Sequence, residues 1–208
     1  MVFVWRGQQM SSVSDALQPM PESLLRLSVE QYHDMARQGV LLDGDPVELL
    51  EGLLVKKMTI SPSHRRSTRR VRIALEGIAP SGCYVDAPSP VTLQRSEPEP
   101  DVVVVRGAEK DYPDRHPGPQ DLLMVVEVSD SSLRRDQGFK KAIYARAAIP
   151  VYWIVNLMDR RVEAYSDPTG AVEQPNYRLR RDFGEADDVP VVIDGCEVAR
   201  IPVRDVLA

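Results

Sequence analysis

The chain lacks any long hydrophobic run, and cysteine is scarce in it. No stretch of the 208 residues approaches the roughly 20 consecutive apolar residues that a membrane-spanning helix requires. The opening segment, MVFVWRGQQ, has neither the basic nor the apolar region of a signal peptide. Cys83 and Cys196, the only two cysteines, have neither metal-ligand nor redox spacing. We therefore expect a cytoplasmic protein with free thiols and no membrane partner.

An excess of basic residues is also missing. The 26 Lys and Arg residues are outnumbered by 31 Asp and Glu, giving a net charge of -5. This balance argues weakly against a general nucleic-acid coat protein, but it does not exclude an enzyme that grips nucleic acid locally. Repeats and low-complexity tracts are absent, and 43% hydrophobic residues suffice for one sizeable core. We expect residues 1–21, rich in Ser, Gln and Pro, to be a disordered tail, and residues 22–208 to form a single domain.

Helix and strand signals alternate along the chain. A short helix is expected after Ser28, which serves as the cap, with Gly39 as the stop. A second, arginine-rich helix is expected at about 64–78, and a third at about 136–148, ended by Pro150. Strands are expected on both sides of a Glu51–Gly52 turn, within 82–93, and at 101–105, 122–128, 152–156 and 161–165, with more antiparallel strands beyond. This order predicts an α/β or α+β fold with a mixed central sheet flanked by helices.

The segment Leu122 to Ser132, LLMVVEVSDSS, raises a question of chemistry. Five apolar residues precede Glu127, as in a strand that is covered on both faces. A carboxylate there loses its hydration, which is costly unless a partner or a bound ion compensates. Asp101 opens the neighbouring valine strand, and adjacent strands can place the two carboxylates side by side. Magnesium suits such a pair, because it prefers oxygen ligands and binds one or two carboxylates together with phosphate oxygens.

Helical periodicity selects a lysine for the same site. With Phe139 at zero and about 100° per residue, Lys140 falls at about 100°, within the apolar stripe of the third helix. Lys141, at about 200°, falls at the edge of the stripe and is expected to be a solvated charge. A lysine on a packed face needs an anionic partner to keep its proton. Lys140 is therefore the candidate to contact a scissile phosphate or to position the attacking water.

These residues resemble a known family. Pro100-Asp101, Glu-Val-Ser at 127–129, Lys140 with Tyr144, and YWIVN resemble the Uma-two family, together with VELLEG at 47–52 and SPSH at 61–64. The resemblance covers about Val47 to Tyr165. It implies a restriction-endonuclease-like core of the PD-(D/E)xK type and magnesium-dependent DNA cleavage, with Mn²⁺ able to substitute. It also implies DNA as the partner and, often, a homodimer.

The resemblance includes two departures. The parent motif has a lysine two residues after the glutamate, where this chain has Ser129. The family pattern places the lysine on the following helix instead, at the Lys140 that periodicity selects. Asn156 stands where aspartate commonly follows YWIV, and we do not expect it to be catalytic.

Supporting residues have two interpretations each. Glu48 could be a catalytic or metal-binding group, or an outward strand charge. His64 could line the site, or cap the helix structurally. The basic cluster on the second helix could track a DNA backbone, or be a solvated face; the candidates for DNA contact are Arg65, Arg66 and Arg69. Tyr144, like Tyr152 and Trp153, is assigned to core packing.

The leading interpretation is a metal-dependent DNA endonuclease in which Asp101 and Glu127 hold Mg²⁺ and Lys140 stabilises the transition state. One alternative is a catalytically silent dimeric module that binds DNA or protein, in which the three residues form a structural ion-pair network. Another is a phosphoesterase that acts on a substrate other than nucleic acid. Magnesium titration distinguishes the endonuclease from the silent module, and the size of the pocket distinguishes the phosphoesterase from the endonuclease.

Overall fold

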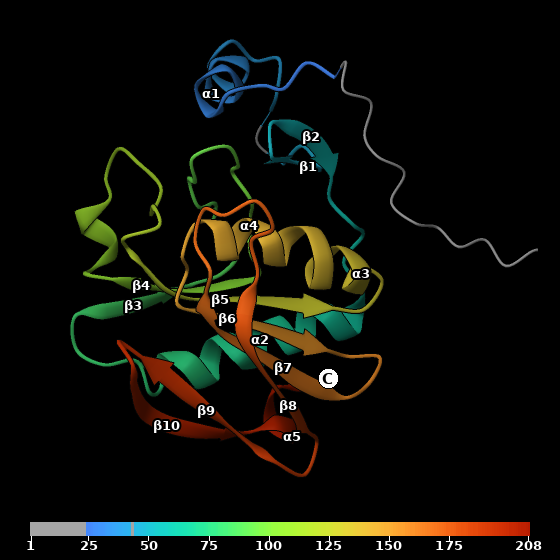
Figure 1. The fold of residues 1–208 in the computed structure, drawn as a ribbon, viewed down its shortest axis with the longest axis vertical. Coiled ribbons are helices and arrows are strands. Elements are labelled where there is room, and N and C mark those ends of the chain that lie inside the picture. Colours follow the sequence, from blue (N-terminus) through green and yellow to red (C-terminus); the bar gives the residue numbers. More distant parts are fainter. Residues whose placement is uncertain (1–23, 43) are drawn as a thin grey trace, which may run out of the picture.

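A six-stranded mixed sheet forms the centre of the molecule, in a computed structural model that describes residues 24–42 and 44–208 (Figure 1). Its strand order is β3-β4-β5-β6-β7-β8, with β5 and β6 parallel and every other pair antiparallel. The strands are β3 (Cys83–Asp86), β4 (Val102–Arg106), β5 (Leu122–Ser129), β6 (Val151–Asn156), β7 (Arg161–Pro168) and β8 (Tyr177–Gly184). The predicted mixed sheet is confirmed. The predicted disordered tail, residues 1–21, lies outside the described residues.

The two innermost strands are buried on both faces. All eight residues of β5 are buried, as are all six of β6. A parallel pair needs a crossover, which here is a helical segment made of α3 (Leu133–Arg135), a π-helical turn η2 (Asp136–Lys140) and α4 (Lys141–Arg146). This segment corresponds to the helix predicted at about 136–148, although it begins three residues earlier and contains the unpredicted π turn.

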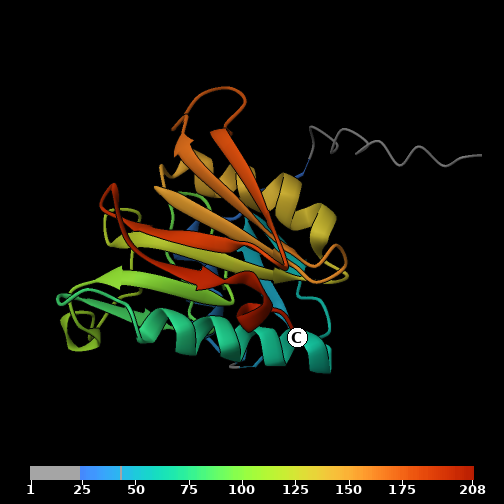
Figure 2. The ribbon, with the colours of Figure 1, turned by 90° about the horizontal axis from the view of Figure 1, so that it is seen from below.

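Two layers cover the sheet. Figure 2 shows α2 (Pro62–Glu76) along one face and the α3–α4 segment against the other. On the α2 side, Val71 and Leu75 pack with sheet residues such as Val104 and Val126. On the α4 side, Ile143 and Tyr144 pack in a second cluster against the opposite sheet face. Because both faces are covered, a polar side chain on β5 must find its partners inside the protein.

The elements before α2 form a small lobe. Helix α1 (Val29–Arg37) follows Ser28, the predicted cap, whose hydroxyl accepts a hydrogen bond from the Gln31 N–H in a capping box. Strands β1 (Val47–Leu50) and β2 (Leu53–Lys56) form the predicted hairpin. At the turn, Gly52 has φ +78°, and a Cβ there would lie 2.8 Å from the Leu27 carbonyl oxygen, so a side chain would not fit.

The C-terminal segment adds β9 (Asp188–Ile193), β10 (Cys196–Pro202) and α5 (Val203–Val206). Strands β9 and β10 pair antiparallel, and residues from all three elements join the core on the α2 side. Of the strands expected within 82–93, the structure has one, β3. A short 3₁₀ turn, Glu109–Asp111, interrupts the predicted surface loop.

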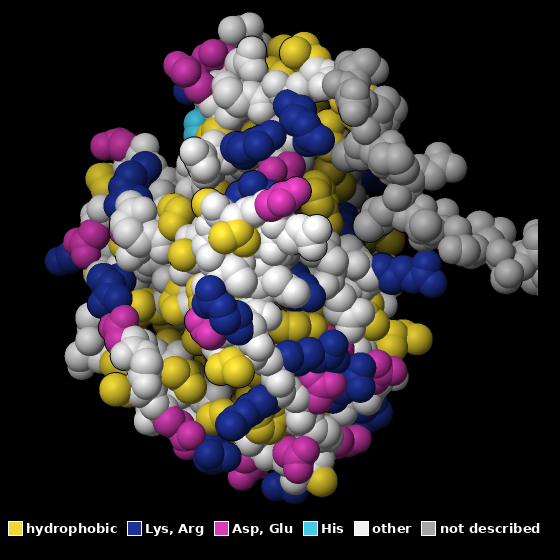
Figure 3. All heavy atoms as spheres, viewed as in Figure 1, with side chains coloured by type: hydrophobic (Ala, Val, Ile, Leu, Met, Phe, Trp, Pro, Cys, Tyr) yellow, Lys and Arg dark blue, Asp and Glu magenta, His cyan; other side chains and the backbone are white. Residues whose placement is uncertain are grey.

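The surface is of mixed charge. Figure 3 shows basic and acidic side chains interspersed over the described part of one face, as the small net charge suggests. Among residues 24–42 and 44–208, no helix combines the length and the apolar character needed to cross a bilayer.

Candidate active site

A cavity of about 400 Å³ lies beside the carboxyl-terminal half of β5 and brings most of the predicted site residues together. Its walls come from β1, from the linker after β2, from α2, from the segment before β4, from β5 and from the α3–η2 crossover. The predicted residues that line it are Glu48, His64, Arg65, Arg69, Asp101, Glu127 and Lys140. Arg66 is not among its lining residues, whereas Arg72, which is not one of the three candidates for DNA contact, is.

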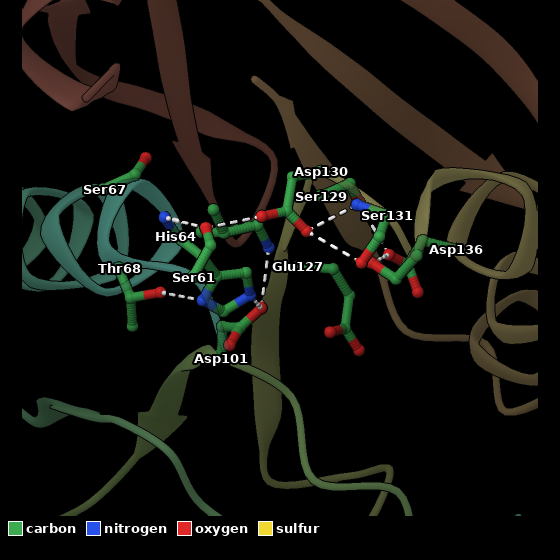
Figure 4. Close-up of polar contacts among 12 residues, drawn as sticks. Ser61, His64, Ser67, Thr68, Asp101, Glu127, Ser129, Asp130, Ser131 and Asp136 are labelled. Atoms are coloured by element: carbon green, nitrogen blue, oxygen red, sulfur yellow. Dashed lines mark hydrogen bonds and ion pairs between the residues drawn. The ribbon is translucent and has the colours of Figure 1, made fainter. Parts of the chain in front are cut away.

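Strand register places the two predicted metal-binding carboxylates side by side. Strands β4 and β5 are antiparallel, with Val102 opposite Val126, so Asp101 comes opposite Glu127. The Asp101 Oδ2 atom accepts a hydrogen bond of 2.8 Å from the Val128 N–H, which fixes its carboxylate against β5. Figure 4 shows the Asp101 and Glu127 carboxylates next to one another at the start of β4 and the end of β5.

Lys140 closes the group from the other side. Its Nζ donates to Glu127 Oε1 at 2.9 Å and lies 3.1 Å from Glu48 Oε2. The Tyr144 hydroxyl donates to the same Glu127 oxygen at 2.7 Å. Glu48, Glu127 and Lys140 are 2%, 4% and 3% exposed, so their interactions are only weakly screened by water. The outward-facing interpretation of Glu48 is therefore wrong.

The π-helical turn aims Lys140 at the sheet. Turns of this kind are rare and occur mostly as single-turn bulges inside α-helices, frequently at functional sites. Asp136 and Lys140, the first and last residues of η2, are both buried, while Phe139 is only half-buried. The prediction that Lys140 lies on the packed face is confirmed. Lys141, predicted to be a solvated charge, is instead half-buried, with its Nζ 5.3 Å from the centre of the Tyr165 ring.

The cluster holds more acidic groups than its single lysine can balance. Burial raises the pKa of Glu127 to about 8, opposed by the Lys140 charge and reinforced by Asp136, Asp101 and Glu48. Burial alone would lower the pKa of Lys140, but Glu127, Glu48 and Asp136 raise it above its usual value. Lys140 therefore stays charged. Further positive charge in the cavity would stabilise ionised Glu127.

His64 touches the other carboxylate of the pair. Ser61 caps α2 and Pro62 occupies its first turn, which places His64 over the start of β4. The His64 Nε2 atom lies 3.2 Å from Asp101 Oδ2, and its Nδ1 lies 3.4 Å from the Thr68 hydroxyl (Figure 4). Burial would lower the pKa of His64, but the hydrogen bond and charge of Asp101 raise it. His64 thus lines the site and holds Asp101 in place.

Only one side of the arginine cluster on α2 faces the cavity. Arg65, Arg69 and Arg72 are spaced by four and three residues, as on one face of a helix, and all three line the cavity. Arg72 pairs with Glu76, whereas neither Arg65 nor Arg69 forms an ion pair with any residue that the structure describes. These two guanidinium groups are therefore available to an anionic ligand.

Some residues of the site were missed or assigned only to packing. Arg135 lies 3.7 Å from Glu48 Oε1 and lines the cavity. Asp136 accepts hydrogen bonds from the hydroxyls of Ser129 and Ser132, at 2.6 and 2.5 Å. Tyr144 packs in the core as predicted, yet its hydroxyl reaches Glu127. Its spacing of four residues from Lys140 was the signal for that contact, because such residues share a helix face.

The two departures from the parent motif have structural explanations. Ser129 binds Asp136 and anchors η2, so the serine at the position of the missing lysine holds the segment that supplies Lys140. Asn156 is fully buried and donates to Glu163 at 2.9 Å and to Asp159 at 3.1 Å. Its contacts are structural, consistent with the expectation that it is not catalytic.

The donor set fits a hard divalent cation that also binds a substrate oxygen. Within the described ranges, no group of three or more His, Cys, Asp or Glu side chains is arranged to hold a metal by itself. Asp101 Oδ1 and Glu127 Oε2 have no hydrogen-bond partner among the described residues, and both side chains line the cavity. Magnesium commonly takes only one or two carboxylates, with water and phosphate oxygens completing the shell.

Comparisons with known proteins identify the family and the fold of this chain. The model of the Uma2 family, described as putative restriction endonucleases, matches residues 29–199. A crystal structure of "a putative nuclease belonging to DUF820" from Anabaena variabilis superposes with a TM-score of 0.62 at 13% identity, covering 86% of this chain and 97% of that one. A search of curated proteins found no match. Because the family match spans most of the sequence, the chain belongs to the Uma2 family of putative restriction endonucleases, and its fold is shared with a putative nuclease.

Proposed function

We propose that the protein is a magnesium-dependent DNA endonuclease that hydrolyses phosphodiester bonds in the cavity beside β5. The observation that supports this best is the convergence of Asp101, Glu127 and Lys140 on one cavity, with two carboxylate oxygens left unpaired. Family membership supports a nuclease, and the geometry adds a specific set of residues.

Each side chain has a defined task in this proposal. Asp101 and Glu127 would hold Mg²⁺, with Mn²⁺ able to substitute; when bound, the ion supplies Lewis acidity for the phosphate and lowers the pKa of water. Lys140, anchored by Glu127 and Glu48, presents its ammonium to the phosphate and stabilises the negative charge that develops there. Glu48 positions Lys140, and His64 positions Asp101. Water attacks phosphorus and loses a proton to solvent, the P–O bond to the leaving oxygen breaks, and that oxygen takes up a proton from solvent.

DNA is the proposed substrate because basic side chains flank the acidic floor. Arg65 and Arg69 line the cavity without described partners, and they could bind phosphates on either side of the cleaved bond. A row of cations along α2 suits a polymeric phosphodiester better than a small phosphoester. We retain the homodimer as a prediction, which light scattering on the purified protein tests. The free thiols of Cys83 and Cys196 fit the proposed cytoplasmic location.

The competing function is a catalytically silent module that binds DNA or protein. Lys140 already bonds to both Glu127 and Glu48, and a purely structural ion-pair network would contain the same contacts. In that case the buried charges stabilise the crossover, and magnesium has no effect on DNA.

Plasmid nicking separates the two functions. The wild-type protein is incubated with supercoiled plasmid in Mg²⁺, Mn²⁺ or EDTA, beside Glu127→Gln and the control Glu173→Gln, which changes an exposed carboxylate. We expect nicking by the wild type and by the control with either metal, and none with EDTA or with Glu127→Gln. Equal nicking by Glu127→Gln would reject the site, and no nicking by any protein would favour the silent module.

A further inference from the structure

Two exposed apolar side chains stand at the rim of the cavity. Met58 and Ile60 lie in the linker between β2 and α2, line the cavity, and are 47% and 58% exposed. Large exposed apolar groups at the mouth of a mostly charged site are unexpected, because contact with water costs them free energy. Ile60 does not stabilise the start of α2 through a hydrophobic staple, because it precedes the cap Ser61 and the residue that it would meet is Arg65.

The linker is held in place at both ends. The Lys57 N–H donates to the Pro46 carbonyl at 2.8 Å, and Arg135 donates to the Lys56 carbonyl at 3.1 Å. At the other end, the Ser61 hydroxyl donates to Asp130 at 2.6 Å. Met58 and Ile60 thus lie on a short segment whose two ends are held by hydrogen bonds, which limits the positions that they can take, as a pre-organised contact surface would require.

The surroundings indicate what these side chains would contact. The same cavity is lined by Arg65 and Arg69, which suit phosphates, and its floor contains the buried Glu127 and Lys140. A phosphodiester must enter the cavity to reach those two groups, which brings its neighbouring nucleotides against the rim. Charged groups at the rim would contact the phosphates of the DNA backbone. Met58 and Ile60 are then left to contact the bases.

We propose that Met58 and Ile60 form an apolar wedge that unstacks the base step next to the cleaved phosphodiester, so that the substrate is duplex DNA opened locally on binding. Met and Ile are among the residues that other proteins insert between base pairs, partly unstacking them and kinking the duplex. This inference rests on the proposed function, since it takes the cavity floor as the cleavage site. It adds that unpaired or bulged DNA, in which the step is already unstacked, needs no wedge.

The test compares paired and bulged DNA. The variant Met58→Ser with Ile60→Ser is matched by a control, Met158→Ser with Leu179→Ser, which changes side chains that are 70% and 58% exposed and do not line the cavity. Magnesium-dependent cleavage is measured on a fully paired duplex and on the same duplex with a single-nucleotide bulge. In parallel, 2-aminopurine placed at successive positions of the duplex reports unstacking through its fluorescence on binding.

We expect the wedge variant to cleave the paired duplex at least tenfold more slowly than wild type, and the bulged duplex at nearly the wild-type rate. Wild type should raise the fluorescence at one or two adjacent positions, and the wedge variant should not. Equal losses on both substrates, or no loss on either, would overturn the wedge. A fluorescence rise without any cleavage would support the wedge while rejecting the nuclease. Cleavage by wild type without a rise would reject the wedge and leave the nuclease intact.

Discussion

Replacing Glu127 with glutamine should stabilise the fold at alkaline pH, even though it removes one of the two proposed metal ligands. Glu127 is buried among Glu48, Asp101 and Asp136 with one lysine in contact, and its pKa rises from 4.5 to about 8. Between these pH values the folded state holds a proton that the unfolded state has lost. The contribution of Glu127 to the free energy of unfolding is therefore fully present below about pH 4.5 and is lost as the pH rises through about 8.

The size of the effect follows from the same shift. At about 1.4 kcal/mol per pKa unit, a rise from 4.5 to about 8 corresponds to an upper bound of about 5 kcal/mol once Glu127 is fully ionised. Glutamine keeps the shape of the side chain and an oxygen that can accept from Lys140 and Tyr144. We therefore expect Glu127→Gln to be more stable than wild type above pH 8, by roughly 2 kcal/mol or more, and to match it in acid.

Urea denaturation of the metal-free protein measures this difference. Wild type and Glu127→Gln are unfolded at a series of values from about pH 5 to about pH 9, with Glu173→Gln as the control. As the pH rises across this range, the free energy of unfolding of wild type should fall relative to that of Glu127→Gln. The free energy of unfolding of Glu173→Gln should change in parallel with that of wild type. If Glu127→Gln is less stable than wild type by a constant 3–5 kcal/mol or so, Glu127 is one half of a simple buried ion pair. The charge-crowding argument would then be wrong.

Three further predictions concern other parts of the site. Lys140→Met should lower the free energy of unfolding by about 3–5 kcal/mol at neutral pH, measured by urea denaturation, because Glu127 then has no cation in contact and Glu48 keeps only Arg135, 3.7 Å away. Replacing Arg65 and Arg69 by alanine should reduce the slope of log affinity against log salt for duplex DNA by about two, whereas Arg66→Ala should change it less. Magnesium at about a hundredfold its Kd should raise the free energy of unfolding of wild type by about 2.7 kcal/mol, and Asp101→Asn should remove this gain in thermal melts with and without the ion.

Much of the fold could be predicted because burial leaves a strong pattern. The apolar run of β5 predicted a strand covered on both faces, and all eight of its residues are buried. The Ser28 cap and the Glu51–Gly52 turn predicted α1 and the β1–β2 hairpin through local backbone chemistry. The π turn had no such signal, because a single extra residue in a helix depends on the packing of both neighbouring segments.

Some residues of the site could likewise be predicted from the sequence, and others could not. Asp101, Glu127 and Lys140 could be selected because each interrupts or joins an apolar pattern, and the structure brings all three to one cavity. The face on which Glu48 points could not be decided, because alternation along a strand shows which residues share a face but not which face is inward. Arg135 reaches the cavity from a one-turn helix, and nothing in its local sequence indicates that position.

Binding of Mn²⁺ to the metal-free protein, followed by electron paramagnetic resonance, tests the central claim most directly. Wild type and Glu173→Gln should each reduce the free-ion signal by one bound ion per chain, while Asp101→Asn and Glu127→Gln should leave the signal of the free ion almost unchanged. Equal binding by all four proteins, or by none, would contradict a divalent-ion site built from the two carboxylates.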